Sequence, residues 1–156
     1  MINDTLHLKG SSSRDTFKYL HKTELPGSFY ALDADLELVA KKPVPHIVAR
    51  LDFKLEGDTI SFTEVIAYNY FINMNPPIPV YIIEAVGPFE EALPKDHRFR
   101  ICRYNGGDYR PTPPTWDMEC SRKLYGWQGL GAWERELRRR RRKQVKLQMH
   151  LNKPTP

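Results

Sequence analysis

The chain has 156 residues, of which 40% are hydrophobic and 28% charged, the size and composition of one globular domain with room for a core. No stretch approaches the roughly 18 apolar residues of a transmembrane helix, and the first residues lack a signal-peptide pattern, so we expect no membrane span. The two cysteines, at positions 102 and 120, are too few for a disulfide framework and lack the paired spacing of a zinc knuckle. We therefore expect a reducing cytoplasm, in a prokaryotic cell or a virus-infected host.

The net charge of +5 combines two oppositely charged parts of the chain. Residues 1–120 contain 13 Lys and Arg against 17 Asp and Glu, whereas residues 121–156 contain 11 against 2. The body is therefore acidic and the C-terminal part strongly basic, which indicates two separate roles on one chain. A basic segment of this kind attracts polyanions, either nucleic acid or acidic lipid headgroups.

Hydrophobic periodicity and turn residues predict a mixed α/β domain. After a flexible N-terminus over 1–13, the predicted elements in chain order are a helix over about 14–25, strands over 29–39 and 46–55, a helix over 60–72, strands over 80–83 and 99–104, and a basic helix over 132–149. The first two strands are joined by a short proline-containing turn, so we expect them to pair as an antiparallel hairpin. Residues 105–108 are predicted to form a turn. We divide the rest of the chain into an α/β core over 14–110 and a segment over 111–156 that contains prolines, tryptophans and the basic helix.

Acidic residues gather on one face of the predicted hairpin. Three carboxylates alternate along the first strand, at Asp33, Asp35 and Glu37, and therefore point to the same side. On the second strand, Asp52 and Lys54 also share a face, within an otherwise hydrophobic segment. A carboxylate and an ammonium in a core strand are costly unless they are paired or hold a metal ion. A hairpin can bring Asp35 and Asp52 to one cation, and oxygen ligands suit Mg²⁺ or Mn²⁺.

These residues resemble the signature of a known family. Asp35, followed seventeen residues later by Asp52-Phe53-Lys54, is similar to the motif of the PD-(D/E)XK nuclease superfamily. In the next helix, Glu64 and Tyr68 resemble the Q-x-x-x-Y motif of its RecB-like branch, with Glu in place of Gln. The predicted order of helix, hairpin, helix and strand is also similar to that family's core, and the resemblance covers about residues 14–87.

The resemblance implies a restriction-endonuclease-like core and a metal-dependent enzyme that hydrolyses phosphodiester bonds in DNA. The catalytic residues it implies are Asp35, Asp52, Lys54, Glu64 and Tyr68. Asp35, Asp52 and the backbone carbonyl of Phe53 would hold Mg²⁺ (or Mn²⁺), and Lys54 would assist the attacking water. Asp33 and Glu37 are secondary candidates, as outer or second-metal residues.

Each of these residues also has a purely structural interpretation. Asp52 and Lys54 can form an ordinary cross-strand ion pair, and only one of Asp33 and Asp35 need be a ligand. Ser61 with Glu64 forms the S-x-x-E pattern of a helix capping box. Tyr68 can simply pack in the core.

The basic helix predicts a contact with nucleic acid, and we expect this to be DNA. Its cationic residues are Arg138, Arg139, Arg140, Arg141, Arg142, Lys143 and Lys146. Such a helix binds phosphates through counterion release without reading sequence. The alternatives are a solvated helix whose thin apolar stripe docks on the body, a non-catalytic nucleic-acid-binding protein, and a module that binds an acidic protein partner. The sequence leaves open whether the chain forms a homodimer.

Overall fold

The computed structural model describes residues 13–24, 30–31, 36–89 and 91–153. Its elements in chain order are α2 (Ser13–Glu24), β1 (Tyr30–Ala31), β2 (Leu36–Ala40), β3 (His46–Leu55), α3 (Phe62–Ile72), β4 (Val80–Ala85), a 3₁₀ turn η1 (Pro94–Asp96), β5 (Phe99–Asp108), β6 (Thr115–Cys120) and α4 (Trp127–Leu151). The protein is thus of the α/β class, with a mixed sheet and a long C-terminal helix.

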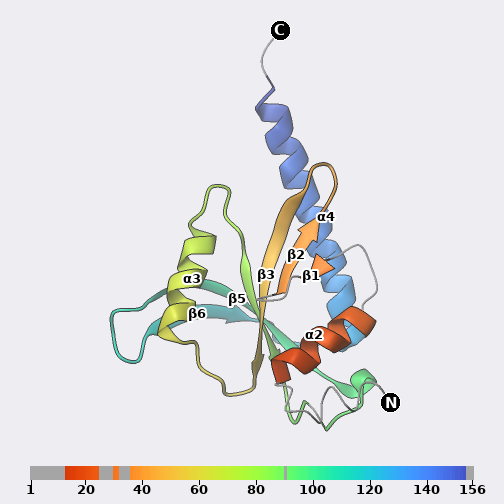
Figure 1. Cartoon of the computed structure of the whole chain (residues 1–156), viewed down its shortest axis with the longest axis vertical. Helices are drawn as coiled ribbons and strands as arrows, with labels where there is room; N and C mark the ends of the chain where they lie inside the picture. The colour runs from red at the N-terminus through yellow and green to blue at the C-terminus, as the bar shows by residue number, and fades with distance from the viewer. Residues whose placement is uncertain (1–12, 25–29, 32–35, 90, 154–156) are drawn as a thin grey trace.

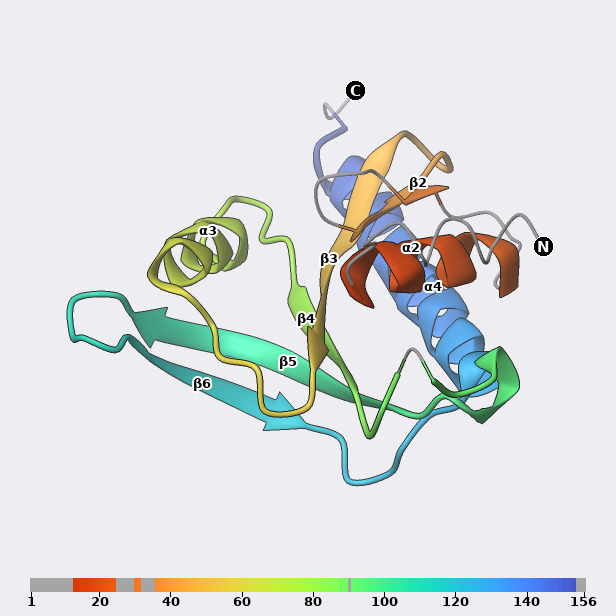
Figure 2. The ribbon, with the colours of Figure 1, turned by 60° about the horizontal axis from the view of Figure 1, so that its bottom comes forward.

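The strands lie in the sheet in chain order, from β1 to β6. All neighbouring pairs are antiparallel except β3 and β4, which run parallel and are connected through α3. Helix α3 covers one face of the sheet, and α2 and α4 cover the other (Figure 1; Figure 2). The molecule therefore has three layers, with apolar contacts on both faces of the central strands.

Each face of the sheet has its own core. The core under α2 and α4 includes Phe17, Leu51, Phe53, Ile83, Phe99, Trp127 and Leu130. Here the rings of Phe17 and Phe53 stack with centroids 4.5 Å apart, which fastens α2 to β3. The core under α3 includes Val65, Tyr68, Ile82, Cys102 and Tyr104. Because successive residues of β3 point to opposite faces, Leu51 and Phe53 enter the first core while Asp52 faces α3.

Most elements with a clear local pattern are confirmed. The first helix, the strand over 46–55, the helix that begins after Ser61 and the apolar strand at 80–83 all form. Ser61 caps α3 as expected, because its hydroxyl accepts from the Glu64 backbone N–H while the Glu64 side chain accepts from the Ser61 N–H.

The single strand expected over 29–39 is wrong. β1 and β2 run antiparallel, with Tyr30 opposite Val39, so the chain reverses direction between Ala31 and Leu36. Alternating apolar and polar residues fit one long strand and two short strands equally well. The alternation therefore does not predict where the chain reverses direction.

The turn expected at 105–108 is also wrong, because those residues belong to β5 and pair with the unpredicted strand β6. The register shifts just before Gly106, whose φ of +124° favours glycine. At Gly107 a Cβ would lie 2.6 Å from the Thr115 carbonyl oxygen, so glycine permits the close approach of the two strands. The glycines thus serve a bulged hairpin, whose connection runs through residues 109–114.

The structure also joins the two cysteines. Cys102 on β5 lies directly opposite Cys120 on β6, and the two form a disulfide. The pairing could not be predicted from the spacing of the two cysteines, because it depends on the unpredicted strand β6. A disulfide does not suit a reducing cytoplasm well. The cytoplasmic location therefore stays a prediction, and the disulfide argues against it. Within the described ranges, no helix is long and apolar enough to cross a membrane.

Candidate active site

Asp52 is the central residue of the candidate site. It lies in β3, and only 1% of its surface is exposed. Leu51 and Phe53, its neighbours in the strand, point into the core under α2 and α4, whereas the Asp52 carboxylate points toward α3. Burying a carboxylate is unfavourable without strong partners, and those partners come from α3 and from the same strand.

Helix α3 supplies two of these partners. Glu64 and Tyr68 are four residues apart and so lie on the same side of the helix, above β3. The Tyr68 hydroxyl donates a hydrogen bond to Asp52 Oδ2, and it lies 3.0 Å from Glu64 Oε2. The capping box at Ser61 orients Glu64 at the start of the helix, so the same carboxylate serves both the cap and the site.

Lys54 supplies the positive charge. Its Nζ lies 2.5 Å from Glu64 Oε2 and 3.7 Å from Asp52 Oδ2. The Lys54 side chain is 12% exposed and that of Glu64 24%, so the site is closed at Asp52 and reaches solvent at Glu64. We refer to Asp52, Lys54, Glu64 and Tyr68 as the Asp52 cluster.

The electrostatics keep Glu64 ionised. Burial alone raises the pKa of Glu64, but hydrogen bonds with Asp52, Lys54 and Ser61 outweigh burial and lower its pKa to about 2. Glu64 is therefore a carboxylate at neutral pH, the form that binds a metal ion.

Tyr104 supports the cluster from β5, although the sequence analysis did not single it out. Its ring packs edge-on against Tyr68, with centroids 5.2 Å apart, and its hydroxyl donates to Asn69 at 2.7 Å. Burial raises the pKa of Tyr104 to about 12, so it stays protonated. Its position two residues after Cys102, on the same face of the strand, is the sequence signal that could have identified it.

Four of the predicted residues thus come together, and the others do not join them within the described chain. Glu37 lies on β2 and pairs with Arg50 at 3.5 Å, and Arg50 also covers the ring of Phe71 at 4.2 Å. Asp33 and Asp35 lie outside the described residues. The first described residue of β2, Leu36, pairs with Leu51, next to Asp52.

The oxygen donors of the cluster suit a hard cation. Asp52 and Glu64 offer two carboxylates, and the backbone carbonyl of Phe53 is a third oxygen nearby in the chain. No group of three or more His, Cys, Asp or Glu side chains forms a metal site among the residues that the structure describes. The two described carboxylates are of the type that Mg²⁺ and Mn²⁺ prefer.

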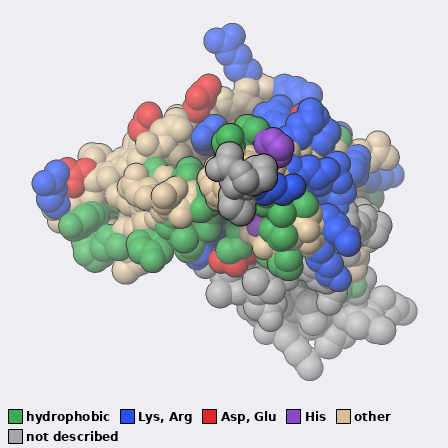
Figure 3. Space-filling model, turned by 90° about the horizontal axis from the view of Figure 1, so that it is seen from above, with side chains coloured by type: hydrophobic (Ala, Val, Ile, Leu, Met, Phe, Trp, Pro, Cys, Tyr) green, Lys and Arg blue, Asp and Glu red, His purple; other side chains and the backbone are tan. Residues whose placement is uncertain are grey.

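The basic helix lies on the other side of the sheet. The first half of α4 is anchored there, with Trp127 and Leu130 in the core and Trp133 packed edge-on against Tyr81 at 4.9 Å. The alternative in which an apolar stripe of this helix docks on the body holds for this half, since Trp133 and Leu137 pack against the core. The second half carries the predicted arginines and lysines, and Lys and Arg side chains gather around α4 in the view along it (Figure 3).

Neither protein families, curated proteins nor solved structures give a match to this chain.

Proposed function

We propose that this protein is a metal-dependent nuclease that hydrolyses phosphodiester bonds in DNA. The observation that carries the proposal is the convergence of Asp52, Lys54 and Glu64, with Tyr68, at one place between β3 and α3. The family resemblance depends on these same residues. Asp52 and Lys54 form the acid-x-lysine pair of the strand, and Glu64 and Tyr68 form the acid-x-x-x-tyrosine pair of the next helix.

Stability alone is a weak explanation for this cluster. Replacing a buried ion pair with apolar residues of similar volume often leaves a protein equally stable or more stable, because buried charges lose their hydration. Asp52 is almost fully enclosed and Lys54 nearly so, in a strand whose other residues are mostly apolar. Clustered ionisable groups that include a member with a perturbed pKa, here Glu64, are frequent at catalytic sites.

The order of elements supports a restriction-endonuclease-like core of the RecB-like type. From α2 to β4 the chain has a helix, antiparallel strands, a helix and a strand, as the resemblance implies. In that arrangement the acid and the lysine occupy the strand before the second helix, and the glutamate and tyrosine occupy that helix, as they do here.

The roles follow from the chemistry of the side chains. Asp52 and Glu64, with the carbonyl of Phe53 and the expected Asp35, would hold the divalent cation. When bound, such a cation lowers the pKa of a coordinated water and neutralises charge on the phosphoryl oxygens. Lys54 presents a positive charge beside both described carboxylates, where it can orient the attacking water and stabilise developing negative charge.

Tyr68 acts as a positioning residue. Its hydroxyl contacts both Asp52 and Glu64 while its ring is held by Tyr104. It therefore fixes the separation of the two carboxylates from the side of α3. The basic residues of α4 would hold the phosphate backbone through exposed positive charge, without choosing a sequence.

A non-catalytic nucleic-acid-binding protein is the second candidate, and one observation favours it. Lys54 already neutralises Glu64 at 2.5 Å, so the cluster can persist as an internal ion pair without a cation. In that case the basic surface of α4 would carry the whole function.

A cleavage assay separates the two candidates. Supercoiled, linear and single-stranded DNA are incubated with the pure protein in Mg²⁺, Mn²⁺ or EDTA. We expect cleavage only with a divalent cation, and a loss of about 10²-fold or more in Asp52→Asn and Lys54→Ala. Asp117→Asn, which changes an exposed carboxylate on β6, is the matched control and should cleave normally. Full activity in the Asp52 or Lys54 variant, or in EDTA, would contradict the proposal.

A further inference from the structure

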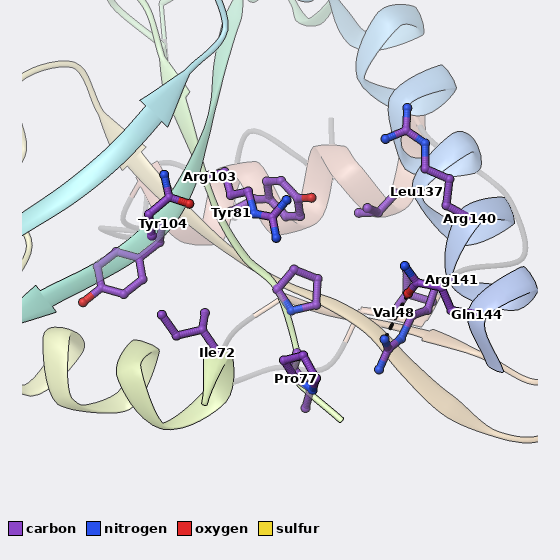
Figure 4. Close-up of a pocket in the computed structure, with 13 residues that line it drawn as sticks. Val48, Ile72, Pro77, Tyr81, Arg103, Tyr104, Leu137, Arg140, Arg141 and Gln144 are labelled. Atoms are coloured by element: carbon purple, nitrogen blue, oxygen red, sulfur yellow. Dashed lines mark hydrogen bonds between the residues drawn. The ribbon is translucent and has the colours of Figure 1, made fainter. Parts of the chain in front are cut away.

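A cavity of about 400 Å³ lies where the C-terminal end of α3, the start of β4 and the middle of α4 meet (Figure 4). Its lining includes Ile72 from α3, Pro77 and Pro79 from the connection to β4, and Leu137 from α4. This volume is within the range of pockets that bind small molecules. The cavity is separate from the Asp52 cluster, and no predicted function accounts for it.

Three guanidinium groups line this cavity. Arg103 comes from β5 and Arg140 and Arg141 come from α4, so positive charge approaches from opposite walls (Figure 4). No Asp or Glu is among the described residues that line it. Arg140 is partly neutralised by Glu136 at 3.1 Å, and Glu119 lies opposite the exposed Arg103 in the pairing of β5 with β6. No ion pair is formed by Arg141 with a described carboxylate, so cations still outnumber anions at this cavity. The cavity therefore has a net positive charge.

Arg141 is the most informative of the three. Its side chain is half-buried, and its Nε–H is buried without a hydrogen-bond partner among the described residues. Its Nη1 donates to Gln144 at 3.2 Å, a neutral acceptor. Burial lowers the pKa of Arg141, which reflects the loss of water around its charge. A half-buried guanidinium with a buried, unused N–H donor is best satisfied by a planar or tetrahedral oxyanion.

Much of the remaining lining is apolar. The half-buried ring of Tyr81 is held in place by Trp133, and two prolines and Leu137 continue the surface. An isolated phosphate would leave this half of the cavity in contact with water, whereas an aromatic ring would cover it. The side-chain amides of Asn105 and Gln144 lie at the same cavity and can pair with the edge of a base.

We propose that this cavity binds one nucleotide, with the phosphate between Arg103 and Arg141 and the base against Tyr81. A nucleotide supplies both groups that the lining lacks, an oxyanion and a flat ring with hydrogen-bonding edges. The nucleotide can belong to a DNA strand or be free in solution, since the two offer the same chemistry.

The cavity adjoins the Asp52 cluster without overlapping it. Ile72 follows Glu64 by eight residues on α3, a distance of about 12 Å along the helix axis. Tyr104 lines the cavity and also packs on Tyr68. The cavity is also where residues of the basic helix meet residues of the α3 side, so a strand that contacts α4 could place a nucleotide here.

Calorimetric titration with deoxyadenosine monophosphate in EDTA tests the proposal, because no cleavage can occur under these conditions. We expect saturable binding at one site, and a loss of about tenfold in affinity in both Arg141→Gln and Arg103→Gln. Deoxyadenosine lacks the phosphate, and inorganic phosphate lacks the base. Each should therefore bind at least about tenfold more weakly than the nucleotide. Arg135→Gln removes an exposed arginine of α4 outside the cavity and should bind as the wild type does.

Competition with a single-stranded oligonucleotide identifies the source of the nucleotide. Displacement by the oligonucleotide assigns the cavity to a DNA strand, and failure to displace assigns it to a free nucleotide; either result supports the site. The proposal is overturned if no saturable binding occurs at millimolar nucleotide, or if Arg141→Gln and Arg103→Gln, both folded by circular dichroism, bind as tightly as Arg135→Gln. Because cleavage is not measured, this outcome is distinct from failure of the proposed nuclease activity.

Discussion

Replacing Lys54 with methionine isolates the electrostatic role of the lysine. Methionine has a similar length and no charge, so the change removes the ammonium that lies 3.7 Å from Asp52 and 2.5 Å from Glu64. Asp52 is 1% exposed and would keep the Tyr68 hydroxyl as a donor. Its carboxylate would lose the adjacent positive charge.

The expected cost is large for a single substitution. Two unit charges at this distance attract by about 4 kcal/mol at an effective dielectric constant of about 20. Removing one partner of a buried pair typically costs about 3–5 kcal/mol. Since Lys54 is partly exposed and Tyr68 remains, we expect the lower end, about 3 kcal/mol in the free energy of unfolding. For a domain of this size that corresponds to a fall of about 6–12 °C in Tm.

Urea denaturation of four proteins measures this effect: the wild type, Lys54→Met, Asp52→Asn and the double variant. If Lys54 compensates Asp52, the penalty of Lys54→Met should be smaller by about 1 kcal/mol or more when Asp52 is already neutral, and the remainder reflects the pairing of Lys54 with Glu64 at 2.5 Å. An equal penalty in both backgrounds would refute the electrostatic coupling of Lys54 to Asp52.

Three further predictions concern stability. Ser61→Ala should lower the free energy of unfolding by about 1 kcal/mol, because it removes the α3 cap, and chemical denaturation would contradict this if the midpoint did not move. Glu134→Ala should cost about 3 kcal/mol, since Glu134 contacts the buried His21 at 2.6 Å between α4 and α2; a thermal shift below about 2 °C would argue against that anchor. Burial lowers the pKa of His97, and its Nδ1 accepts from the Trp127 indole, so protonation is disfavoured in the folded state. Stability should therefore be full above about pH 6.5 and decrease as the pH falls below it; urea midpoints that stay constant between pH 7 and pH 5, or a His97→Leu variant with the same pH dependence, would contradict this role.

Local signals in the sequence predicted the part of the fold that carries the cluster. The S-x-x-E pattern at Ser61 and the prolines after Asn75 bound α3, and alternation along β3 placed Asp52 and Lys54 on one face. Helical spacing then aligned Glu64 with Tyr68. Strand periodicity fixes which side chains share a face, which is why Asp52 and Lys54 could be named from the residues alone. Glu64 and Tyr68 were named because they resemble the family motif.

The remaining features depend on contacts that no local pattern encodes. The strand β6 was missed because the glycines of β5 resemble a turn, and the disulfide between Cys102 and Cys120 was missed with it. The contact between His21 and Glu134 joins residues 113 positions apart. The arginine-lined cavity likewise draws on α3, β4, β5 and α4, so its charge becomes visible only after these elements are packed together.

Binding of Mn²⁺ to the protein alone tests the central claim, that the Asp52 cluster holds a divalent cation. Isothermal titration of the wild type, Asp52→Asn and the exposed-surface control Asp117→Asn would report the affinity of the site. We predict saturable binding at one site in the wild type and the control, and at least about tenfold weaker binding in Asp52→Asn. Equal affinity in all three proteins, or no saturable binding in the wild type, would contradict the account.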